Sequence, residues 1–255
     1  MTSLSVIIIA KNEAHNIVDC VHSCSFADEV IVLDSGSTDG TVELARQAGA
    51  QVYETDWPGF GPQKQRALTK ARSDWVMSID ADERIEDLLR NEILHTIKRP
   101  EAEGYRMPRL SSFCGQFIYH SGWRPDRVLR LAKREHALFS DHLVHERMIV
   151  KGRIKDLKND LIHHSYRDWA DVMDKMDRYS TAGAQQLLNQ QKPSLGLGAM
   201  VLHASWAFFR TYILRMGLLD GGMGFNLAIY NAQCTYYKYL KHREMCFKIE
   251  SERLT

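Results

Sequence analysis

Two aspartates, Asp80 and Asp82, stand two residues apart at the end of the largely apolar run 74–79. Side chains at positions i and i+2 of a strand point to the same side, so a strand that ends in Asp-Ala-Asp aims both carboxylates into one cleft. Two carboxylates there suit a divalent cation that also holds phosphate oxygens. The alternative is structural: Asp80 ends the strand and Asp82 caps a helix that starts near Ile85.

The first half of the chain alternates between strand and helix patterns. Strands are expected at Leu4–Ala10, Glu29–Leu33, Ala50–Glu54 and in the run that ends at Asp80, with helices over residues 14–25, 41–48 and 63–71. Strands and helices that alternate at this spacing form βαβ units. The pattern therefore predicts a parallel sheet with helices on both faces.

Polar residues follow three of these strands directly. Lys11–Glu13 follow the first strand, Asp34 ends the second, and Asp80 and Asp82 end the fourth. In such sheets ligands bind beyond the carboxyl ends of the strands. These residues are therefore expected to border one ligand cleft.

The composition bounds the class of protein. The chain has 255 residues, 44% of them hydrophobic and 25% charged, as in ordinary globular proteins, and its net charge of +1 argues against a nucleic-acid partner. Its five cysteines include no C-x-x-C pair, which predicts reduced thiols in a cytosolic protein. Residues 5–10 lack the basic flank and cleavage site of a secretory signal, so they are expected to form a buried strand.

The elements become shorter from Gly104 onward. Strand-like runs at 104–108, 116–119, 127–131 and 147–150 predict mixed or antiparallel strands that extend the sheet and wall one side of the cleft. Helical composition returns over 168–189. The expected domains are a core over residues 1–165 and a helical region over residues 166–255.

Three segments, in this order, carry a family resemblance: 5–13 (SVIIIAKNE), 32–41 (VLDSGSTDGT) and 78–83 (SIDADE). Together they resemble the family 2 glycosyltransferases. These have the GT-A fold, a Rossmann-like α/β core with a mixed sheet that binds a nucleotide sugar. Segments 122–131, 144–146 and 217–225 are similar to a narrower branch, which glucosylates heptose in the inner core of bacterial lipopolysaccharide or lipooligosaccharide.

The resemblance implies roles for residues at the ends of the first two strands. Ala10, Asn12 and Glu13 are expected to border the nucleotide base and ribose, and Asp34 to hydrogen-bond uridine. The family more commonly has Asp-Asp before Gly-Ser, whereas this chain has Asp-Ser, so base recognition is expected to differ in detail. The structural alternative for this segment is a turn that caps a helix.

The resemblance also implies a metal site. Asp82 would ligate Mg²⁺ or Mn²⁺ bridging the donor diphosphate, and Asp80 would join it there or touch the ribose or donor sugar. One of His163 and His164, with His163 preferred, would complete the metal sphere. The cation would neutralise the charge on the leaving nucleoside diphosphate. For His163 the alternative is a structural role.

Four basic residues are candidates for binding phosphate. Lys64 and Arg66, at the start of a predicted helix, would add positive charge near the phosphates, unless they form a solvated helix face. Arg127 and Arg130 lie three apart in a strand-like run, and a regular strand cannot turn both to one side. One would clamp phosphate, and the other would pair with Asp126 or meet solvent.

An inverting sugar transfer needs a base that accepts the proton of the acceptor hydroxyl. In related enzymes this base is a carboxylate past the middle of the core. Glu146 holds the matching position and is preferred to Asp126 and Asp141. The alternative for Glu146 is a surface side chain paired with Arg147.

The C-terminal section is apolar but carries charges at intervals. His203, Arg210 and Arg215 interrupt the run 195–219, so no membrane span is expected there. Aromatic residues together with Arg210, Arg215, Lys238, Lys241 and Arg243 suit a helix that lies on an anionic membrane surface. The alternative is a helical pair that packs on the core or on a second subunit. The oligomeric state is left open.

These features favour an inverting, metal-dependent glycosyltransferase at the cytoplasmic face of the inner membrane. It would move a hexose, with glucose from UDP-glucose preferred, to a lipid-linked saccharide. A sugar-1-phosphate nucleotidyltransferase shares the architecture, but it needs a Gly-rich loop that Lys11–Ala14 does not provide. A non-catalytic nucleotide-sugar-binding protein of the same fold is the third class, and the acidic pair with a candidate base argues against it.

Overall fold

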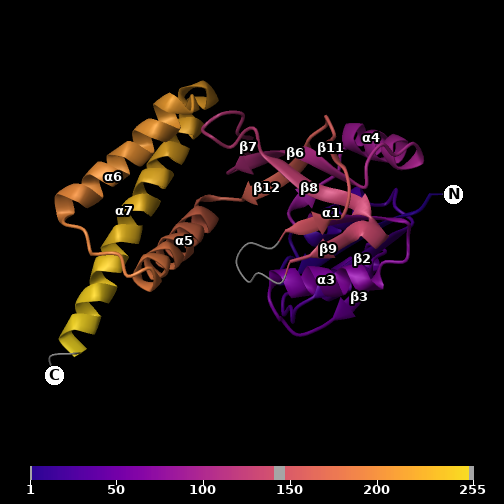
Figure 1. Cartoon of the computed structure of the whole chain (residues 1–255), viewed down its shortest axis with the longest axis horizontal. Coiled ribbons are helices and arrows are strands. Elements are labelled where there is room, and N and C mark those ends of the chain that lie inside the picture. Colours follow the sequence, from indigo (N-terminus) through magenta and orange to yellow (C-terminus); the bar gives the residue numbers. More distant parts are fainter. Residues whose placement is uncertain (1, 141–146, 253–255) are drawn as a thin grey trace. The chain divides into compact units, whose positions relative to one another are not determined.

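The computed structural model describes residues 2–140 and 147–252 (Figure 1). The chain divides into two compact units, one of Met1–Leu110 with Pro125–His163 and the other of Ser111–Arg124 with His164–Thr255. The second unit thus takes in residues 111–124, which the sequence pattern assigns to the core.

The first unit contains most of the strands. These are β1 (Leu4–Ala10), β2 (Glu29–Asp34), β3 (Gln51–Glu54), β4 (Trp75–Asp80), β5 (Glu83–Arg84), β8 (Arg127–Lys133), β9 (Ala137–Phe139), β10 (Met148–Val150) and β11 (Ile154–Asp156). Its helices are α1 (Ile17–Ser23), α2 (Thr41–Gln47), α3 (Phe60–Lys70), α4 (Asp87–Lys98) and the short η1 (Arg134–His136). Two strands, β6 (Gly104–Phe113) and β12 (Leu161–Tyr166), begin in this unit and end in the other.

The main sheet is mixed, as predicted. Its order is β3-β2-β1-β4-β8-β6-β12-β5. Strands β1 to β4 pair in parallel, whereas β8 runs antiparallel to both β4 and β6. The carboxyl ends of β1, β2 and β4 therefore share one edge, and the amino end of β8 lies beside the carboxyl end of β4.

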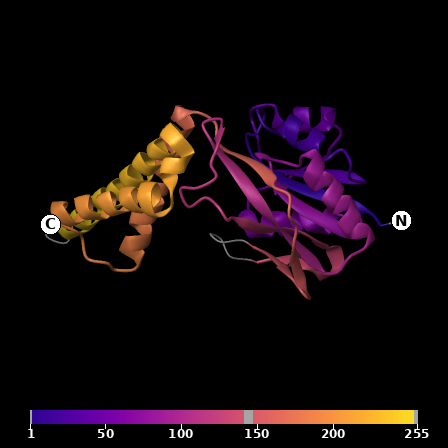
Figure 2. The same cartoon turned by 90° about the horizontal axis from the view of Figure 1, so that it is seen from above.

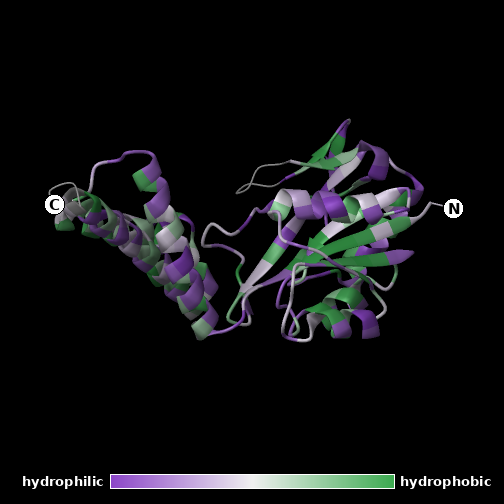
Figure 3. Ribbon diagram, turned by 90° about the horizontal axis from the view of Figure 1, so that it is seen from below, coloured by the Kyte–Doolittle hydropathy of each residue, from purple (hydrophilic) through white to green (hydrophobic). Residues whose placement is uncertain are grey.

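Alternating side chains of β1 explain why this strand is apolar at every position except Ser5. Leu4, Val6 and Ile8 pack into a core that includes residues of α1 and α4, while Ile7 packs on the opposite face with residues of α3. Successive side chains of a strand point to opposite faces, so a strand covered on both faces is apolar at nearly every position. The exception, Ser5, is buried and its hydroxyl donates to the carboxylate of Glu29. Figures 2 and 3 show the helices around the sheet and its hydrophobic strands.

Helix α3 begins earlier than the sequence pattern predicts. The sequence pattern starts this helix at residue 63, after a run rich in Pro and Gly, whereas the helix starts at Phe60. Pro62 lies in the first turn, where the missing N–H costs no helical hydrogen bond. The early start places Lys64 on the second turn of the helix.

The second unit is built around a long helix. Its elements are β7 (Gln116–Phe117), α5 (Trp169–Asn189), α6 (Leu197–Phe209), η2 (Arg210–Leu214), η3 (Gly217–Asp220) and α7 (Gly221–Glu252). Both α5 and α6 pack along α7. The predicted C-terminal helices are confirmed. As expected, no helix of the described residues is long and apolar enough to cross a membrane.

The buried carboxylate of Asp220 connects two segments of the second unit. The N–H groups of Tyr119 and His120 donate to Oδ1 of Asp220 at 3.0 and 3.1 Å, and the Ser121 hydroxyl donates to Oδ2 at 2.7 Å. The side chain of Asp220 is only 2% exposed. These bonds attach segment 119–121 to the end of η3, which explains why residues 111–124 belong to this unit.

We expect Asp220→Asn to lower the free energy of unfolding by about 2–3 kcal/mol, because the amide loses the charge and turns a donor toward donors. Urea unfolding measures this. Asp174→Asn is the matched control, since Asp174 lies on α5 with 65% of its side chain exposed, and it should change stability by about 0.5 kcal/mol or less. Equal effects of the two substitutions would contradict this structural role.

Candidate active site

The loops after β1 and β2 are hydrogen-bonded to each other at the carboxyl edge of the sheet. Asn12 adopts a left-handed backbone conformation with φ of 56°, which asparagine tolerates better than most residues. Its N–H donates to the Ser37 hydroxyl at 2.8 Å, and its Oδ1 accepts from the Thr38 N–H at 2.9 Å. The Glu13 N–H donates to Oγ1 of Thr41 at 2.8 Å. The residues expected to border the nucleotide are thus held in one place.

The carboxylate of Asp34 accepts hydrogen bonds from the turn that follows it. Its Oδ2 accepts the N–H groups of Gly36 and Ser37 at 2.9 and 2.8 Å, and the whole residue is 1% exposed. Ala10 is buried beside it, and its carbonyl accepts the Ser35 N–H at 3.0 Å. The expected turn is therefore present, while contacts of Asp34 and Ala10 with uridine stay a prediction.

Asp80 and Asp82 do not share a strand. Strand β4 ends at Asp80, and Asp82 lies in the turn before β5, so the expected alignment along one strand is wrong. The two carboxylates have different partners: Asp80 contacts Lys64 and Arg130, whereas Oδ2 of Asp82 lies 3.3 Å from Nε2 of His163. Of the expected metal ligands, Asp82 and His163 are together and Asp80 is engaged elsewhere. No three His, Cys, Asp or Glu side chains within residues 2–140 and 147–252 form a metal-binding group.

Buried ion pairs surround Asp80. Its Oδ1 lies 3.0 Å from Nζ of Lys64, and its Oδ2 accepts a hydrogen bond from Nη2 of Arg130. The same nitrogen of Arg130 donates to Oε1 of Glu83 at 2.7 Å. Glu83 is 0% exposed and also accepts the Asp80 N–H at 2.9 Å. A carboxylate removed from water in this way needs such partners.

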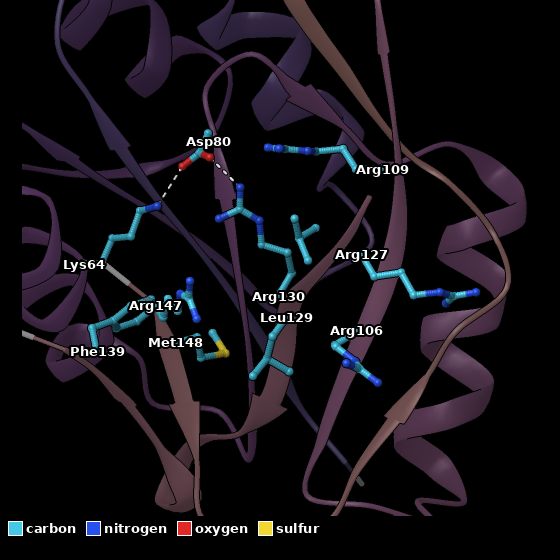
Figure 4. Close-up of a pocket in the computed structure, with 11 residues that line it drawn as sticks. Lys64, Asp80, Arg106, Arg109, Arg127, Leu129, Arg130, Phe139, Arg147 and Met148 are labelled. Carbon is cyan, nitrogen blue, oxygen red and sulfur yellow. Dashed lines mark hydrogen bonds and ion pairs between the residues drawn. The ribbon is translucent and has the colours of Figure 1, made fainter. Parts of the chain in front are cut away.

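The ion pairs continue to the next strand. Nη1 of Arg109 lies 3.4 Å from Oε1 of Glu83, and Nε of Arg109 donates to Oδ2 of Asp126 at 2.8 Å. The result is a chain of six alternating charges in the order Lys64, Asp80, Arg130, Glu83, Arg109 and Asp126. Figure 4 shows its basic members around the cavity.

The charges shift the pKa values of Asp80 and Arg130 in opposite directions. Burial alone would raise the pKa of the Asp80 carboxyl, but the charges of Arg130 and Lys64 outweigh it and lower that pKa. Burial would likewise lower the pKa of the Arg130 guanidinium, and the charges of Asp80 and Glu83 raise it instead. Both groups are therefore charged at neutral pH.

A bulge in β8 sets the direction of Arg130. Leu131 pairs with Tyr105 and Leu129 pairs with Arg106, so Arg130 is an extra residue without a partner across the strand pair. A bulge re-aims side chains. The expectation that a regular strand keeps Arg127 and Arg130 on different sides does not apply, because the strand is irregular and both residues line one cavity.

This cavity has a volume of about 610 Å³ and is strongly basic. It is lined by Lys64, Asp80, Arg106, Arg109, Arg127, Val128, Leu129, Arg130, Phe139, Arg147 and Met148. Its six basic side chains face one carboxylate. Repulsion among them favours an anionic ligand, and arginine forks match phosphate and carboxylate groups.

Arg66, another predicted site residue, lies apart from the cavity lining. Arg66 lies on the surface, where its Nη1 is 2.6 Å from Oδ1 of Asp56. It does not face Asp80 as Lys64 does, because residues two apart on a helix point in different directions. Arg66 therefore belongs to a solvated helix face, whereas Lys64 is 5% exposed and faces Asp80. Glu146 and the alternative base Asp141 lie outside the described residues.

Sequence reasoning missed Glu83, Arg106 and Arg109. Glu83 is the last residue of the acidic motif 78–83. No sequence pattern indicates that its side chain is buried in an ion pair with Arg130. Arg106 and Arg109 belong to a strand whose other residues are mostly buried, with Arg106 exposed and Arg109 half-buried. An arginine in such a strand is a signal for an ion pair or a ligand.

Comparisons with known proteins agree on one family. Residues 5–170 match the model of glycosyl transferase family 2. An uncharacterized glycosyltransferase of Rickettsia prowazekii is 27% identical over 267 residues, which cover 98% of this chain and 90% of that protein. The lipopolysaccharide core biosynthesis glycosyltransferase LpsC of Rhizobium meliloti is 32% identical over 199 residues, covering 74% of this chain and 73% of LpsC.

A solved structure shares the fold. The crystal structure of S. aureus TarS, residues 1–349 in complex with UDP-GlcNAc, has a TM-score of 0.50 and 15% identity. It covers 91% of this chain and 79% of that one. At this identity the similarity concerns the fold alone, and it agrees with the mixed-sheet α/β core followed by helices.

We expect Asp80→Asn to lower the free energy of unfolding at pH 7 by about 1–2 kcal/mol, a value reduced by solvent because 34% of the Asp80 side chain is exposed. Since the folded-state pKa of Asp80 is lowered, this contribution is complete above about pH 4 and is lost as the pH falls further. Urea unfolding from pH 7 to pH 2.5 measures the difference. A difference that instead grows below pH 4 would contradict the account; Asp87→Asn, at an 83% exposed position, is the control.

Proposed function

Because the chain belongs to glycosyltransferase family 2, we propose that this enzyme transfers a hexose, glucose from UDP-glucose, to a lipid-linked saccharide with inversion. One observation carries the proposal. Asp82 and His163 form a carboxylate–imidazole pair. Asp82 follows Asp80 by two residues, and Asp80 ends β4 and lines the basic cavity. A nucleoside diphosphate needs both features: a cation site and fixed positive charge.

The residues present fit a divalent cation. Oδ2 of Asp82 and Nε2 of His163 are 3.3 Å apart and their side chains are 28% and 14% exposed, so both are accessible and mutually oriented. Carboxylate oxygens suit Mg²⁺ and Mn²⁺, and imidazole is a common metal ligand. These two side chains would hold the ion, with diphosphate oxygens as further ligands. When bound, the ion stabilises the negative charge that the leaving diphosphate gains.

The chain's own residues have three tasks in this proposal. Lys64 and Arg130 provide positive charge near the phosphates, and Asp80, fixed between them, orients the ribose or donor sugar. The acceptor oxygen attacks C1 of the sugar while the bond from C1 to the diphosphate breaks. Glu146 takes the acceptor proton. Asp126 is the weaker candidate for this base, because Arg109 already holds its carboxylate.

We propose heptose of the lipopolysaccharide or lipooligosaccharide inner core as the acceptor, and similarity to LpsC, a glycosyltransferase of lipopolysaccharide core biosynthesis, supports an acceptor in that core. The segments 122–131 and 217–225, which resemble the narrower branch, support the same proposal. A nucleotidyltransferase has less support, since the loop after β1 contains no glycine and is held to the β2 loop by Asn12.

We expect the Asp82→Asn variant to bind UDP-glucose at least about tenfold more weakly than wild type in excess Mn²⁺, because one metal ligand loses its charge. Chelation with EDTA should weaken wild type and leave the variant almost unchanged. Isothermal calorimetry measures both. Asp19→Asn, at an exposed position of α1, is the control. Wild-type affinity in the Asp82→Asn variant with Mn²⁺ would remove the metal assignment.

The second unit exposes a large number of apolar side chains along α6, η2 and η3. They are Leu197, Val201, Leu202, Trp206, Phe209, Ile213, Leu214, Met216, Leu218 and Leu219, and each is at least 42% exposed. Exposed apolar surface of this extent marks a binding surface for a partner or a membrane. Within this stretch Arg210 and Arg215 are also exposed.

We propose that this apolar surface lies on the anionic cytoplasmic leaflet of the inner membrane, where the acceptor lipid is anchored. The exposed arginines beside the aromatic residues match the charge of such a leaflet. Lys241 does not contribute, contrary to the sequence-based expectation: its Nζ donates to Asp177 Oδ1 at 2.7 Å and to the Ser180 hydroxyl at 2.9 Å, so it joins α7 to α5.

We expect Leu202→Glu to weaken binding to liposomes that contain phosphatidylglycerol by about tenfold or more, because an apolar side chain in the interface is replaced by an anion. Cosedimentation measures this. Leu88→Glu on α4 is a matched control, since Leu88 and Leu202 are both 71% exposed. If Leu202→Glu leaves liposome binding unchanged but splits a wild-type dimer, the surface binds a second copy instead.

A further inference from the structure

The position of the basic cavity in the sheet suggests what it binds beyond the donor. Strands β8 and β6 lie on the other side of β4 from β1 and β2. The residues expected to hold the nucleotide follow β1, β2 and β4, whereas Arg106 on β6 and Arg127 on β8 lie beyond them. If the proposed function holds, a donor seated over β1 and β4 points its sugar toward these arginines. The arginines then face the place where the acceptor must enter.

The charges around the cavity do not balance. The alternating chain from Lys64 to Asp126 is neutral, with three basic and three acidic side chains. Beyond it, Arg106 and Arg127 share the single carboxylate of Asp156, with Nε of Arg106 at 2.8 Å and Nη1 of Arg127 at 3.7 Å from its oxygens. Arg147 forms no ion pair with any of the described residues. Two positive charges are therefore left over among the residues that the structure describes.

The donor does not account for this surplus. A nucleotide sugar carries about two negative charges on its diphosphate, and one divalent cation at Asp82 and His163 matches them. A hexose is neutral. The part of this surplus carried by Arg106 and Arg127 lies on β6 and β8, beyond the donor site, so it fits a second anion.

One further donor group points to a ligand. The side chain of Arg130 is only 10% exposed, and its buried Nε–H has no hydrogen-bond partner among the described residues. A buried N–H without a partner is costly, and a ligand oxygen in the cavity would satisfy it. This observation is independent of the charge balance.

We propose that the acceptor is an acidic saccharide, whose phosphate or carboxylate group is bound by Arg106 and Arg127. Figure 4 shows both side chains extending away from Asp80, on the β6 and β8 side of the cavity. The Leu157 carbonyl accepts from Nη1 of Arg127 at 3.2 Å and Asp156 holds Arg106, so both guanidinium groups are oriented before the ligand binds. Such preorganised arginine pairs bind tetrahedral and planar anions through paired hydrogen bonds.

Binding of three probes tests the proposal in the presence of UDP and Mn²⁺: glucose 6-phosphate, glucuronate and glucose, each followed by ligand-observed NMR. We expect both anions to bind and glucose to bind at least about tenfold more weakly. The tighter of the two anions identifies the group as phosphate or carboxylate. Equal, weak binding of all three would overturn the proposal.

Variants separate this site from the donor site. Arg106→Gln and Arg127→Gln should each weaken anion binding by about tenfold and change UDP affinity by less than about twofold. Both side chains are partly exposed, at 48% and 41%, so folding should be retained, and Arg90→Gln on α4 is the control.

The proposal and the proposed function fail in different ways. If wild type binds the anions but not UDP-glucose with Mn²⁺, the donor assignment is wrong. If it binds UDP-glucose while Arg106→Gln and Arg127→Gln leave anion affinity unchanged, the acidic-acceptor proposal is wrong.

Discussion

The geometry of the candidate site depends on one buried guanidinium, Arg130, placed between the carboxylates of Asp80 and Glu83. Charges removed from water are stable only when each has a partner. Each ion pair therefore restricts the position of the next side chain. The side chains connected in this way include Lys64 on α3, Asp80 at the end of β4 and Arg109 on β6. The same contacts hold the cavity wall in one conformation.

The six alternating charges from Lys64 to Asp126 sum to zero. They can therefore be distinguished from the basic side chains that attract a ligand. The six alternating side chains satisfy one another, so they define the wall and contribute little net attraction at long range. The attraction comes from the basic residues beyond them, on β6 and β8. In the proposed function, Asp82 and His163 would hold a cation on the donor side, and Arg106 and Arg127, which share one carboxylate, would bind an anion on the acceptor side. This division suits an enzyme that joins two charged substrates and must discriminate between their binding sites.

Local patterns in the sequence predict the elements well and the contacts less well. The apolar run of β1 and the turn residues after β2 depend on near neighbours, so the α/β core and its carboxyl edge could be predicted. The direction of Arg130 depends on a bulge that arises from pairing with β6, and the partner of Asp82 comes from β12, about eighty residues later. Residues 111–124 join the helical unit because Asp220 binds their backbone, which no local pattern reveals. Long-range register decides these features.

We propose that this chain transfers sugar from a metal-bound uridine nucleotide to a saccharide of the lipopolysaccharide core. The most direct measurement is release of nucleotide from a panel of nucleotide sugars, with core lipooligosaccharide as the acceptor, in Mn²⁺ and in EDTA. The account predicts acceptor-dependent release of UDP from UDP-glucose in Mn²⁺, little release in EDTA, and a glucosylated acceptor by mass spectrometry. Equal release with and without EDTA, or a different nucleotide sugar as the only substrate, would contradict it.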